Sequence, residues 1–217
     1  MRFDLAGIAP TDRYKLLAST ITPRPIAWVT TVDTGGRPNA APYSFFNVLG
    51  EDPPVVGFSV ADRGPGLKKD TEVNVRQSGE FVVNLVSRAT LERMNITAID
   101  FPPEVDELDV SGLRTTPAAH VSVPLIAESP VSLECRLFQI VELGPLRSFI
   151  IGEVLAIHIA DRAVVDAQKY YVDNAALDVV GRMHANSYSS TEKTLHLPRL
   201  DLPAEYAARP PVAGAPD

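Results

Sequence analysis

The chain has 217 residues, a formal net charge of −7, 45% hydrophobic residues and 22% charged residues, a composition typical of one globular domain with a substantial core. The acidic balance argues against nucleic acid and anionic membranes as partners, because both bind basic surfaces. No stretch approaches the roughly 18 apolar residues of a membrane span, the N-terminus lacks the apolar run of a signal peptide, and the single cysteine, Cys135, excludes an intrachain disulfide. We therefore expect a cytoplasmic protein without membrane or nucleic-acid partners.

Six short runs of Val, Ile, Thr and aromatic residues predict β-strands between the frequent prolines. The runs cover residues 26–32, 38–43, 55–60, 81–86, 131–143 and 149–159. Residues 34–37 (TGGR) are typical of a tight turn, which makes the first two strands a hairpin. Pro145 lies in the short connection between the last two strands, so these are also expected to form a hairpin.

Three segments have helical signals. Residues 70–78 begin with Asp70 as a capping residue, carry Glu72 in the first turn and end before Gly79. Residues 89–98 and 163–171 are the other two segments. Many strands joined by hairpins, with few helices, predict a mainly β protein built on a small antiparallel barrel with peripheral helices. We assign residues 1–202 to this domain and the Pro- and Ala-rich residues 203–217 to a flexible tail.

The motifs of several common sites do not occur in the sequence. No G-x-G-x-x-G follows a strand, and there is no Walker motif, H-E-x-x-H pair or G-x-S-x-G elbow. The four histidines have no spacing typical of metal ligands. We therefore predict no metal site, and we assign no catalytic side chain.

One cluster of polar residues lies where the helix at residues 70–78 begins. Lys68 and Lys69 come just before this point, Thr71 follows it and Asn74 lies one turn further on. The start of a helix has free backbone N–H groups and a partial positive charge, both of which favour a phosphate. On these residues alone, a second interpretation stays open, in which Asp70 only caps the helix and the lysines are solvated.

The segment from Asn39 to Asn47 (NAAPYSFFN) runs from a strand end into an expected loop. It offers backbone donors, a hydroxyl at Ser44 and the flat apolar surface of two phenylalanines, which together suit a planar ring. The same residues also suit a structural role, with Phe45 and Phe46 as core anchors and the polar side chains in turn hydrogen bonds.

Several short motifs follow one another in a fixed order along most of the chain. They are PRPIAWV at residues 23–29, KDT at 69–71 with Asn74, GEFVVNL at 79–85, GEV at 152–154 and VGR at 180–182. Over roughly residues 16–188, this series resembles the flavin reductase-like family of FMN-binding split barrels. The resemblance implies a six-stranded antiparallel split barrel with peripheral helices, a homodimer, and FMN near the dimer interface.

The resemblance also implies which residues contact FMN. Its isoalloxazine and ribityl parts would lie against Thr30, Thr31, Ala41, Pro42, Ser44, Phe45, Asn47 and Ser59, and its phosphate would be held by Lys68, Lys69 and Thr71. Relatives often carry a glycine-rich stretch after the arginine that corresponds to Arg182, whereas this chain has bulkier residues there. We therefore expect four residues of this stretch to shape the substrate side of the flavin site, either in their own subunit or in that of the partner. They are Arg182, His184, Asn186 and Tyr188.

Flavins transfer hydrides or single electrons, so the chemistry belongs to the cofactor. The function that the resemblance implies first is an NAD(P)H-dependent, FMN-binding flavin oxidoreductase that serves a monooxygenase or another redox partner. Two alternatives stay open: a flavoredoxin-like electron carrier without nicotinamide activity, and a split barrel without flavin that acts as a binding module.

Overall fold

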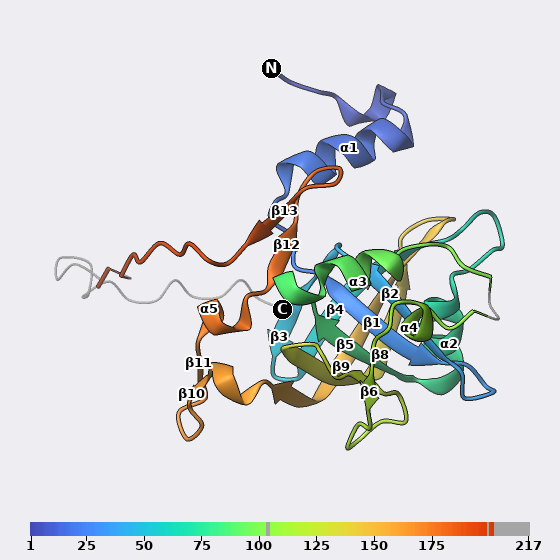
Figure 1. The fold of residues 1–217 in the computed structure, drawn as a ribbon. Coiled ribbons are helices and arrows are strands. Elements are labelled where there is room, and N and C mark those ends of the chain that lie inside the picture. The colour runs from blue at the N-terminus through green and yellow to red at the C-terminus, as the bar shows by residue number, and fades with distance from the viewer. Residues whose placement is uncertain (103–104, 199, 202–217) are drawn as a thin grey trace, which may run out of the picture.

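The computed structural model describes residues 1–102, 105–198 and 200–201 (Figure 1). The expected tail at residues 203–217 lies outside the described residues. The main sheet is antiparallel, with its strands in the spatial order β2-β1-β5-β8-β9-β4-β3. These strands are β1 (Ala27–Val32), β2 (Pro38–Tyr43), β3 (Phe46–Glu51), β4 (Pro54–Ala61), β5 (Glu80–Leu85), β8 (Val131–Glu142) and β9 (Arg147–Ile159).

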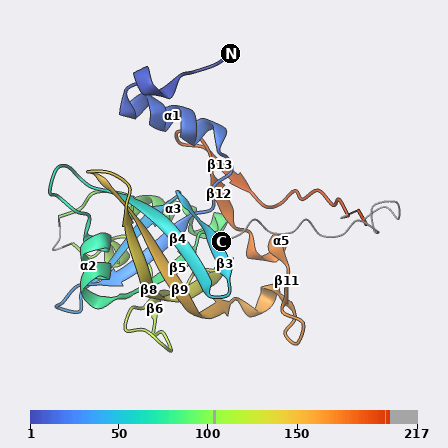
Figure 2. The same ribbon diagram turned by 180° about the vertical axis from the view of Figure 1, so that it is seen from behind.

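The sheet curves into a barrel because its two edge strands are neighbours in the chain. β2 and β3 lie at opposite edges of the sheet, yet only Ser44 and Phe45 separate them in sequence. The edges must therefore approach each other, and β2 lies in contact with β4. The backbone N–H of Ser59 in β4 donates to the carbonyl of Phe45 at 2.8 Å, which extends the β3–β4 pairing into the link. Figure 2 shows the curved sheet from behind.

All six predicted strands are present, but the strand count of six is wrong. Residues after Phe45 were expected to form a loop, and they form β3 instead, which pairs with β4 from Phe46 opposite Phe58 to Glu51 opposite Pro54. The sequence of β3, FNVLGE, carries Asn47 and Gly50, which are typical of turns. Pairing with β4 overrides this preference, and the register shifts between Val48 and Gly50.

Successive side chains of β1 point to opposite faces of the sheet, and both faces are packed. Ala27 and Val29 point into the barrel, with Phe58, Phe81 and Ile150 among its buried residues. Gly152 allows this packing, because a Cβ atom at that position would lie 2.2 Å from Cζ of Phe81. The glycine of the GEV motif is therefore needed for close approach inside the barrel.

The opposite face of β1 is covered by short helices. Trp28 is fully buried there, beneath α3 (Leu91–Ile96) and α4 (Glu107–Val110). Its indole N–H donates to the hydroxyl of Thr97 at 2.9 Å. The helix expected at residues 89–98 is thus present in part, as a 3-10 turn η2 (Arg88–Thr90) followed by α3.

The helix expected at residues 70–78 is confirmed as α2 (Asp70–Ser78), and it ends at Gly79 with φ 72°. Its N-cap is Lys69 and no side chain caps it, so the capping role expected for Asp70 is wrong. The helix expected at residues 163–171 is also wrong. Its residues form part of a 3-10 turn η3 (Asp161–Ala163) and the short strands β10 (Val164–Asp166) and β11 (Tyr171–Val172). Asp166 accepts from the N–H groups of residues 168 and 169, and Tyr170 has a positive φ, so a turn replaces the helix.

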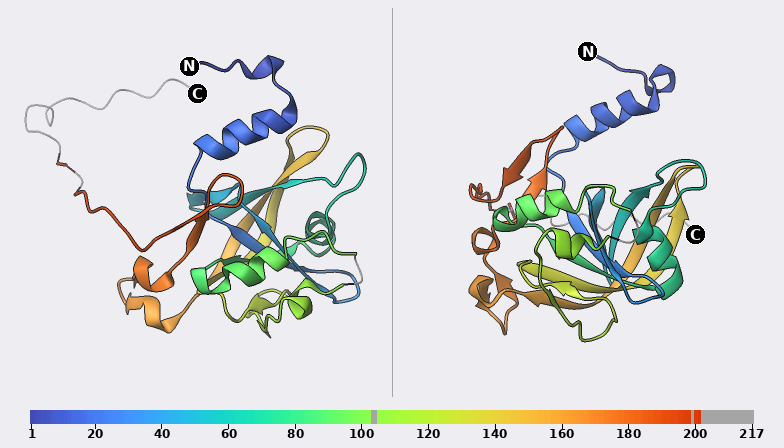
Figure 3. Two further views of the ribbon diagram at one scale, coloured as in Figure 1. Left: turned by 45° about the horizontal axis from the view of Figure 1, so that its top comes forward. Right: turned by 45° about the vertical axis from the view of Figure 1, so that its right-hand side comes forward.

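An unpredicted helix, α1 (Pro10–Thr20), projects from one side of the barrel beside the hairpin of β12 (Val180–Arg182) and β13 (Tyr188–Ser190), as Figure 3 shows. Arg24 joins these parts, because its guanidinium donates to the carbonyls of Ala18 and Ile21 at 2.7 Å and of Met183 at 3.1 Å. The remaining short elements are η1 (Leu5–Gly7), β6 (Thr115–Thr116), β7 (Leu125–Ile126) and α5 (Asn174–Leu177). No described helix is long and apolar enough to cross a membrane.

Candidate functional site

Three adjoining hollows lie along β2 and the residues that follow it. The Lys69 hollow, about 70 Å³, lies between β2, the start of α2 and residues 97–100. The Arg182 hollow, about 210 Å³, lies between residues 42–44, α3 and the β12–β13 hairpin. The Phe45 hollow, about 290 Å³, lies between residues 44–47 and the end of α1. Pro42 lines the first two hollows and Ser44 lines the last two, so the three hollows adjoin, and we refer to them together as the groove.

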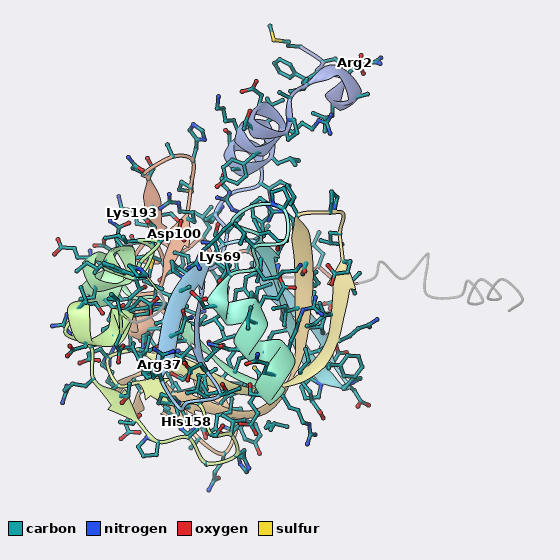
Figure 4. All side chains as sticks on the ribbon, turned by 90° about the vertical axis from the view of Figure 1, so that its right-hand side faces the viewer. Arg2, Arg37, Lys69, Asp100, His158 and Lys193 are labelled. Carbon is teal, nitrogen blue, oxygen red and sulfur yellow. The ribbon has the colours of Figure 1, made fainter. Side chains whose placement is uncertain are left out.

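The Lys69 hollow brings two cations to the start of α2. The ammonium of Lys69 lies 3.0 Å from the carboxylate of Asp100, and the two side chains are labelled in Figure 4. The guanidinium of Arg63 lies 2.9 Å from Asp70 and 3.7 Å from Asp100. Thr71 adds a hydroxyl, and the N–H groups of the first turn of α2 have no side-chain cap. This arrangement can bind an oxyanion that takes the place of the exposed carboxylate of Asp100.

Tyr43 gives the same hollow a buried hydroxyl without a partner. The residue is 8% exposed, and its ring packs on Phe58 at 5.2 Å between centroids. Within the described part of the chain its hydroxyl makes no hydrogen bond of ordinary geometry, although the Thr71 side chain lies near enough to act on its pKa. Burial raises the pKa of Tyr43, so the hydroxyl stays protonated and available as a donor. A buried polar group without a partner needs a physical reason, and an oxygen-rich ligand in the hollow would supply one.

Glu107 closes the inner side of the Lys69 hollow. In β2 the backbone nitrogens of Pro38, Ala40 and Pro42 face away from β1, towards the open edge of the sheet. Proline has no N–H group, so the two prolines leave no unpaired backbone donor at this edge. The remaining donor, Ala40 N–H, bonds to the Glu107 carboxylate at 3.3 Å. Burial raises the pKa of Glu107, which favours the neutral acid beside the hollow.

The two lysines of the predicted phosphate cluster are separated in the structure. Lys69 lines the hollow, whereas the ammonium of Lys68 lies 3.1 Å from Glu72, 3.3 Å from Asp62 and 3.2 Å from the hydroxyl of Ser148. The hydrogen bond to Glu72 is the main reason why the pKa of Lys68 is raised. Lys68 therefore belongs to a largely buried polar cluster, and only Lys69 is brought together with Thr71.

Thr30 and Thr31 are fully buried, and neither lines the groove. The Thr30 hydroxyl donates to the carbonyl of Pro124 at 2.8 Å. The Thr31 hydroxyl accepts from the amide of Asn74 at 3.0 Å, which joins β1 to α2. Their side chains position the barrel and α2, so the expected contact with a ligand is not supported for either side chain.

Phe45 provides a flat surface between charged groups. Its ring centroid lies 5.7 Å from the guanidinium of Arg24 and 5.4 Å from that of Arg147, and its ring stacks on Tyr14 at 6.0 Å. Arg147 also donates to the hydroxyl of Ser59 at 3.2 Å. Ser59 thus lies behind the groove and helps to orient a residue that contacts Phe45.

The remaining predicted residues divide between the groove and the solvent. Ala41 and Pro42 line the Lys69 hollow, Ser44 and Asn47 line the Phe45 hollow, and Arg182 with Tyr188 lines the Arg182 hollow. His184 and Asn186 are exposed and line none of the three hollows. The sequence analysis missed several residues of the groove, which are Tyr14, Arg63, Asn95, Asp100 and Glu107. Asn39 and Tyr43 lie within the candidate segment of residues 39–47 but were given no role of their own, whereas Glu107 carries no local signal.

Residues 19–175 match the family model described as "Flavin reductase like domain". The chain belongs to the flavin reductase-like family. It is 31% identical to nitrilotriacetate monooxygenase component B from Bacillus cereus, with a TM-score of 0.86 over 91% of this chain and 98% of that one. It is 32% identical to 2-nitrobenzoate 2-nitroreductase from Pseudomonas fluorescens, with a TM-score of 0.83 over 99% of this chain and 100% of that one.

The family assignment confirms the resemblance seen in the sequence. A structure from Shewanella frigidimarina that is described by its split barrel domain is 23% identical, with a TM-score of 0.79 over 92% of this chain and 100% of that one. It confirms the mainly β split-barrel fold, whereas the homodimer stays a prediction. Membership of the family supports a flavin-related redox function. Among the described residues, no group of three or more His, Cys, Asp and Glu side chains is arranged to hold a metal ion.

Proposed function

We propose that this protein binds FMN in the groove and acts as an NAD(P)H-dependent flavin oxidoreductase. The observation that carries the proposal is the Lys69 hollow, where two cations, the uncapped start of α2 and the orphaned hydroxyl of Tyr43 meet. The phosphate of FMN would lie there, and the ring would extend past Pro42 and Ser44 towards Phe45. This order runs from the charged end of the groove to its more apolar end.

The size of the Lys69 hollow favours FMN over a dinucleotide. The hollow measures about 70 Å³ and is bounded by β2, α2 and residues 97–100. A terminal phosphate fits this space, whereas a phosphate together with an attached adenosine does not. We therefore propose FMN as the bound flavin, with NADH or NADPH as the electron donor.

When bound, FMN supplies hydride or single-electron transfer at its ring. The chain contributes binding and orientation. Lys69, Arg63 and Thr71 would hold the phosphate, and the hydroxyl of Tyr43 would donate to it. Phe45 would give the ring an apolar support, and the guanidinium groups of Arg24 and Arg147 beside Phe45 make the surroundings positive. A positive environment stabilises negative charge on a reduced flavin. Hydride transfer to such a ring requires no proton donor from the protein, so we assign no catalytic side chain.

We also propose that the protein works as a homodimer. The Phe45 hollow is open and mostly apolar, and α1 and β3 expose Leu17, Ile21, Val48 and Leu49 close to it. A second copy that covered these residues would bury them and shield the ring from water. Light scattering coupled to size exclusion measures the mass directly, and a monomer at micromolar concentration would contradict this part of the proposal.

The similarity to component B of nitrilotriacetate monooxygenase supports a proposal about the redox partner. We propose that reduced flavin passes to a monooxygenase or to another acceptor protein. The alternative electron carrier differs in one measurable respect, because it would hold FMN but would not be reduced by nicotinamide. Stopped-flow loss of the flavin absorption on mixing with NADH or NADPH supports the reductase, and a stable oxidised spectrum supports the carrier. A protein that binds no added FMN would leave the third interpretation, the flavin-free binding module.

The phosphate site is tested with the Lys69→Ala variant and two ligands. Riboflavin has the ring of FMN but no phosphate, so the ratio of the two affinities reports on the phosphate alone. We expect Lys69→Ala to weaken FMN binding about tenfold, which corresponds to about 1.4 kcal/mol, and to leave riboflavin binding unchanged. Lys169→Ala, which removes an exposed lysine far along the chain, is the matched control. Equal loss for both ligands, or loss for neither, would show that the phosphate lies elsewhere.

A further inference from the structure

The chain that follows β13 forms a C-terminal arm, made of the described residues from 192 to 201. Leu195, Leu197 and Leu200 are each at least 90% exposed, so nothing in the described part of the chain packs on them. Leu195 and Leu197 are two residues apart, and side chains at this spacing share one face of an extended segment. Pro198 favours an extended conformation at the residue before it. The arm therefore presents an apolar edge, which is unfavourable in water unless another surface covers it.

The base of the arm is tied to its own subunit. The hydroxyl of Thr191 donates to the carbonyl of Val179 at 3.2 Å. The carboxylate of Glu192 lies 3.5 Å from the guanidinium of Arg88. Beyond this point the arm runs away from the barrel, as Figure 1 and Figure 3 show. At roughly 3.3 Å per residue, the chain from Thr191 to Leu200 reaches at most about 30 Å, which is about the diameter of a small domain. The arm is therefore long enough to reach across a second molecule beside this one.

An apolar groove lies where the arm begins. This hairpin groove, about 260 Å³, lies between the β12–β13 hairpin, the residues that precede β1 and the end of β5. Its walls include Ile26, Leu85, Val86 and Val180. Arg24 is the one charged side chain among the described residues that line it, and its guanidinium is already bonded to backbone carbonyls. The hairpin groove therefore suits aliphatic side chains better than a charged ligand.

The position of the hairpin groove favours a second copy of this chain as the source of the arm. Residues 23–25 line both the hairpin groove and the Phe45 hollow, so the two adjoin. A second copy that covers the Phe45 hollow therefore lies next to the hairpin groove, and twofold symmetry gives each groove one arm. The arm of the same subunit is less favoured. Residues 189–191 form the rim of this groove, so Leu195 would have to turn back almost at once to enter it.

We propose that the arm of one copy places Leu195 and Leu197 in the hairpin groove of a second copy. The inference rests on the homodimer of the proposed function and adds the segment that holds the two copies together. The hairpin groove shares no lining residue with the Lys69 hollow, and it meets the other two hollows only at residues 23–26. The arm and FMN would thus occupy different hollows. Each arm would hold in place the copy that shields the ring end of the flavin groove.

The first experiment measures the dissociation constant of the dimer by sedimentation over a range of protein concentrations. Leu195→Asp combined with Leu197→Asp should raise this constant at least about a hundredfold, since each arm loses two leucines that the dimer buries. Both positions are exposed in one copy, so the circular dichroism of the subunit should be unchanged. Leu143→Asp combined with Leu146→Asp is the matched control, because these exposed leucines lie in the β8–β9 connection.

The second experiment identifies the groove and the subunit that receives the arm. Leu195→Cys and Val179→Cys proteins, each with one new thiol, are mixed and oxidised, and the native Cys135 is buried and does not interfere. Val179 lines the hairpin groove and none of the other three hollows. We expect a disulfide between the two different variants, with the mass of two chains. In a chain that carries both substitutions, an internal disulfide at the mass of one chain would instead assign the arm to its own subunit.

Two results would overturn the inference. One is a dimer whose dissociation constant is the same with Leu195→Asp and Leu197→Asp as in wild type. The other is the absence of the mixed disulfide, whether or not the internal one forms. FMN titrations on the same samples keep this inference apart from the proposed function. A wild-type dimer that needs the arm but binds no FMN contradicts only the flavin assignment, whereas an FMN-binding dimer that ignores the arm substitutions contradicts only this inference.

Discussion

Replacing Asp100 by asparagine should strengthen FMN binding. The carboxylate of Asp100 lies 3.0 Å from the ammonium of Lys69 and 3.7 Å from the guanidinium of Arg63, so it occupies the place that we propose for the phosphate. The hydrogen bond from Lys69 is the main reason why the pKa of Asp100 is lowered, and Asp100 is therefore ionised at neutral pH. A phosphate must displace this carboxylate before it can bind both cations.

The expected size of the effect follows from the exposure of the pair. The side chain of Asp100 is 66% exposed and that of Lys69 is 30% exposed. Exposed ion pairs contribute about 0.2–1 kcal/mol each, because water and salt screen them. Removing the competing carboxylate should therefore lower the free energy of FMN binding by about 0.5–1 kcal/mol, which is about a two- to fivefold gain in affinity.

Fluorescence titration of FMN at low and high salt measures this gain. We expect the difference between Asp100→Asn and wild type to shrink at high salt, since screening weakens the competing pair. Asp109→Asn, which removes an exposed acidic residue on α4 that does not line the hollow, is the control for a general change in net charge. The reasoning is refuted if Asp100→Asn binds FMN more weakly than wild type, or if Asp109→Asn gives the same gain.

Three further predictions concern the same region. Tyr43→Phe should weaken FMN binding about three- to tenfold, by loss of one hydrogen bond worth about 1 kcal/mol, and should leave unfolding of the free protein by urea nearly unchanged, because the hydroxyl has no partner there. Lys68→Ala should lower the free energy of unfolding by about 1 kcal/mol with little effect on FMN affinity, since its bonds go to Glu72 and Asp62. Glu107 has a raised pKa when folded, so its contribution to stability is present below the unfolded pKa and is lost as the pH rises through the folded pKa. Urea unfolding at about pH 4 and about pH 7 should therefore show Glu107→Gln gaining stability over wild type at the higher pH, and a constant difference would contradict the burial argument.

The strands were predictable because their pattern is local. Runs of β-branched and aromatic residues between prolines predicted six strands, and each of them is present in the structure. Gly79 correctly predicted the end of α2. β3 was missed because pairing with β4, across the closed barrel, decides its conformation more than its own residues do. The failed helix at residues 163–171 has the same kind of cause, since a turn stabilised by Asp166 competes with helical bonds.

The phosphate end of the groove was predictable only in part. Lys68 and Lys69 are adjacent in sequence, but the backbone at Lys69 is extended (φ −73°, ψ 150°), so the two side chains leave the chain in different directions. Tyr14, Asp100 and Glu107 come from three separate segments that meet only in the folded barrel. No spacing in the sequence links them, and their place in the groove could not have been inferred without the structure.

The two-residue link between β2 and β3 has a thermodynamic consequence. The groove runs along this link, so it exists only while the opposite edges of the sheet are held together, and a chain with an opened sheet has no place for the ligand. Ligand binding is then coupled to the cooperative unfolding of the whole barrel. A ligand at a concentration of a hundred times its dissociation constant should therefore raise the free energy of unfolding by about 2.7 kcal/mol. Hydrogen exchange at the amide protons of β8 and β9 should slow accordingly.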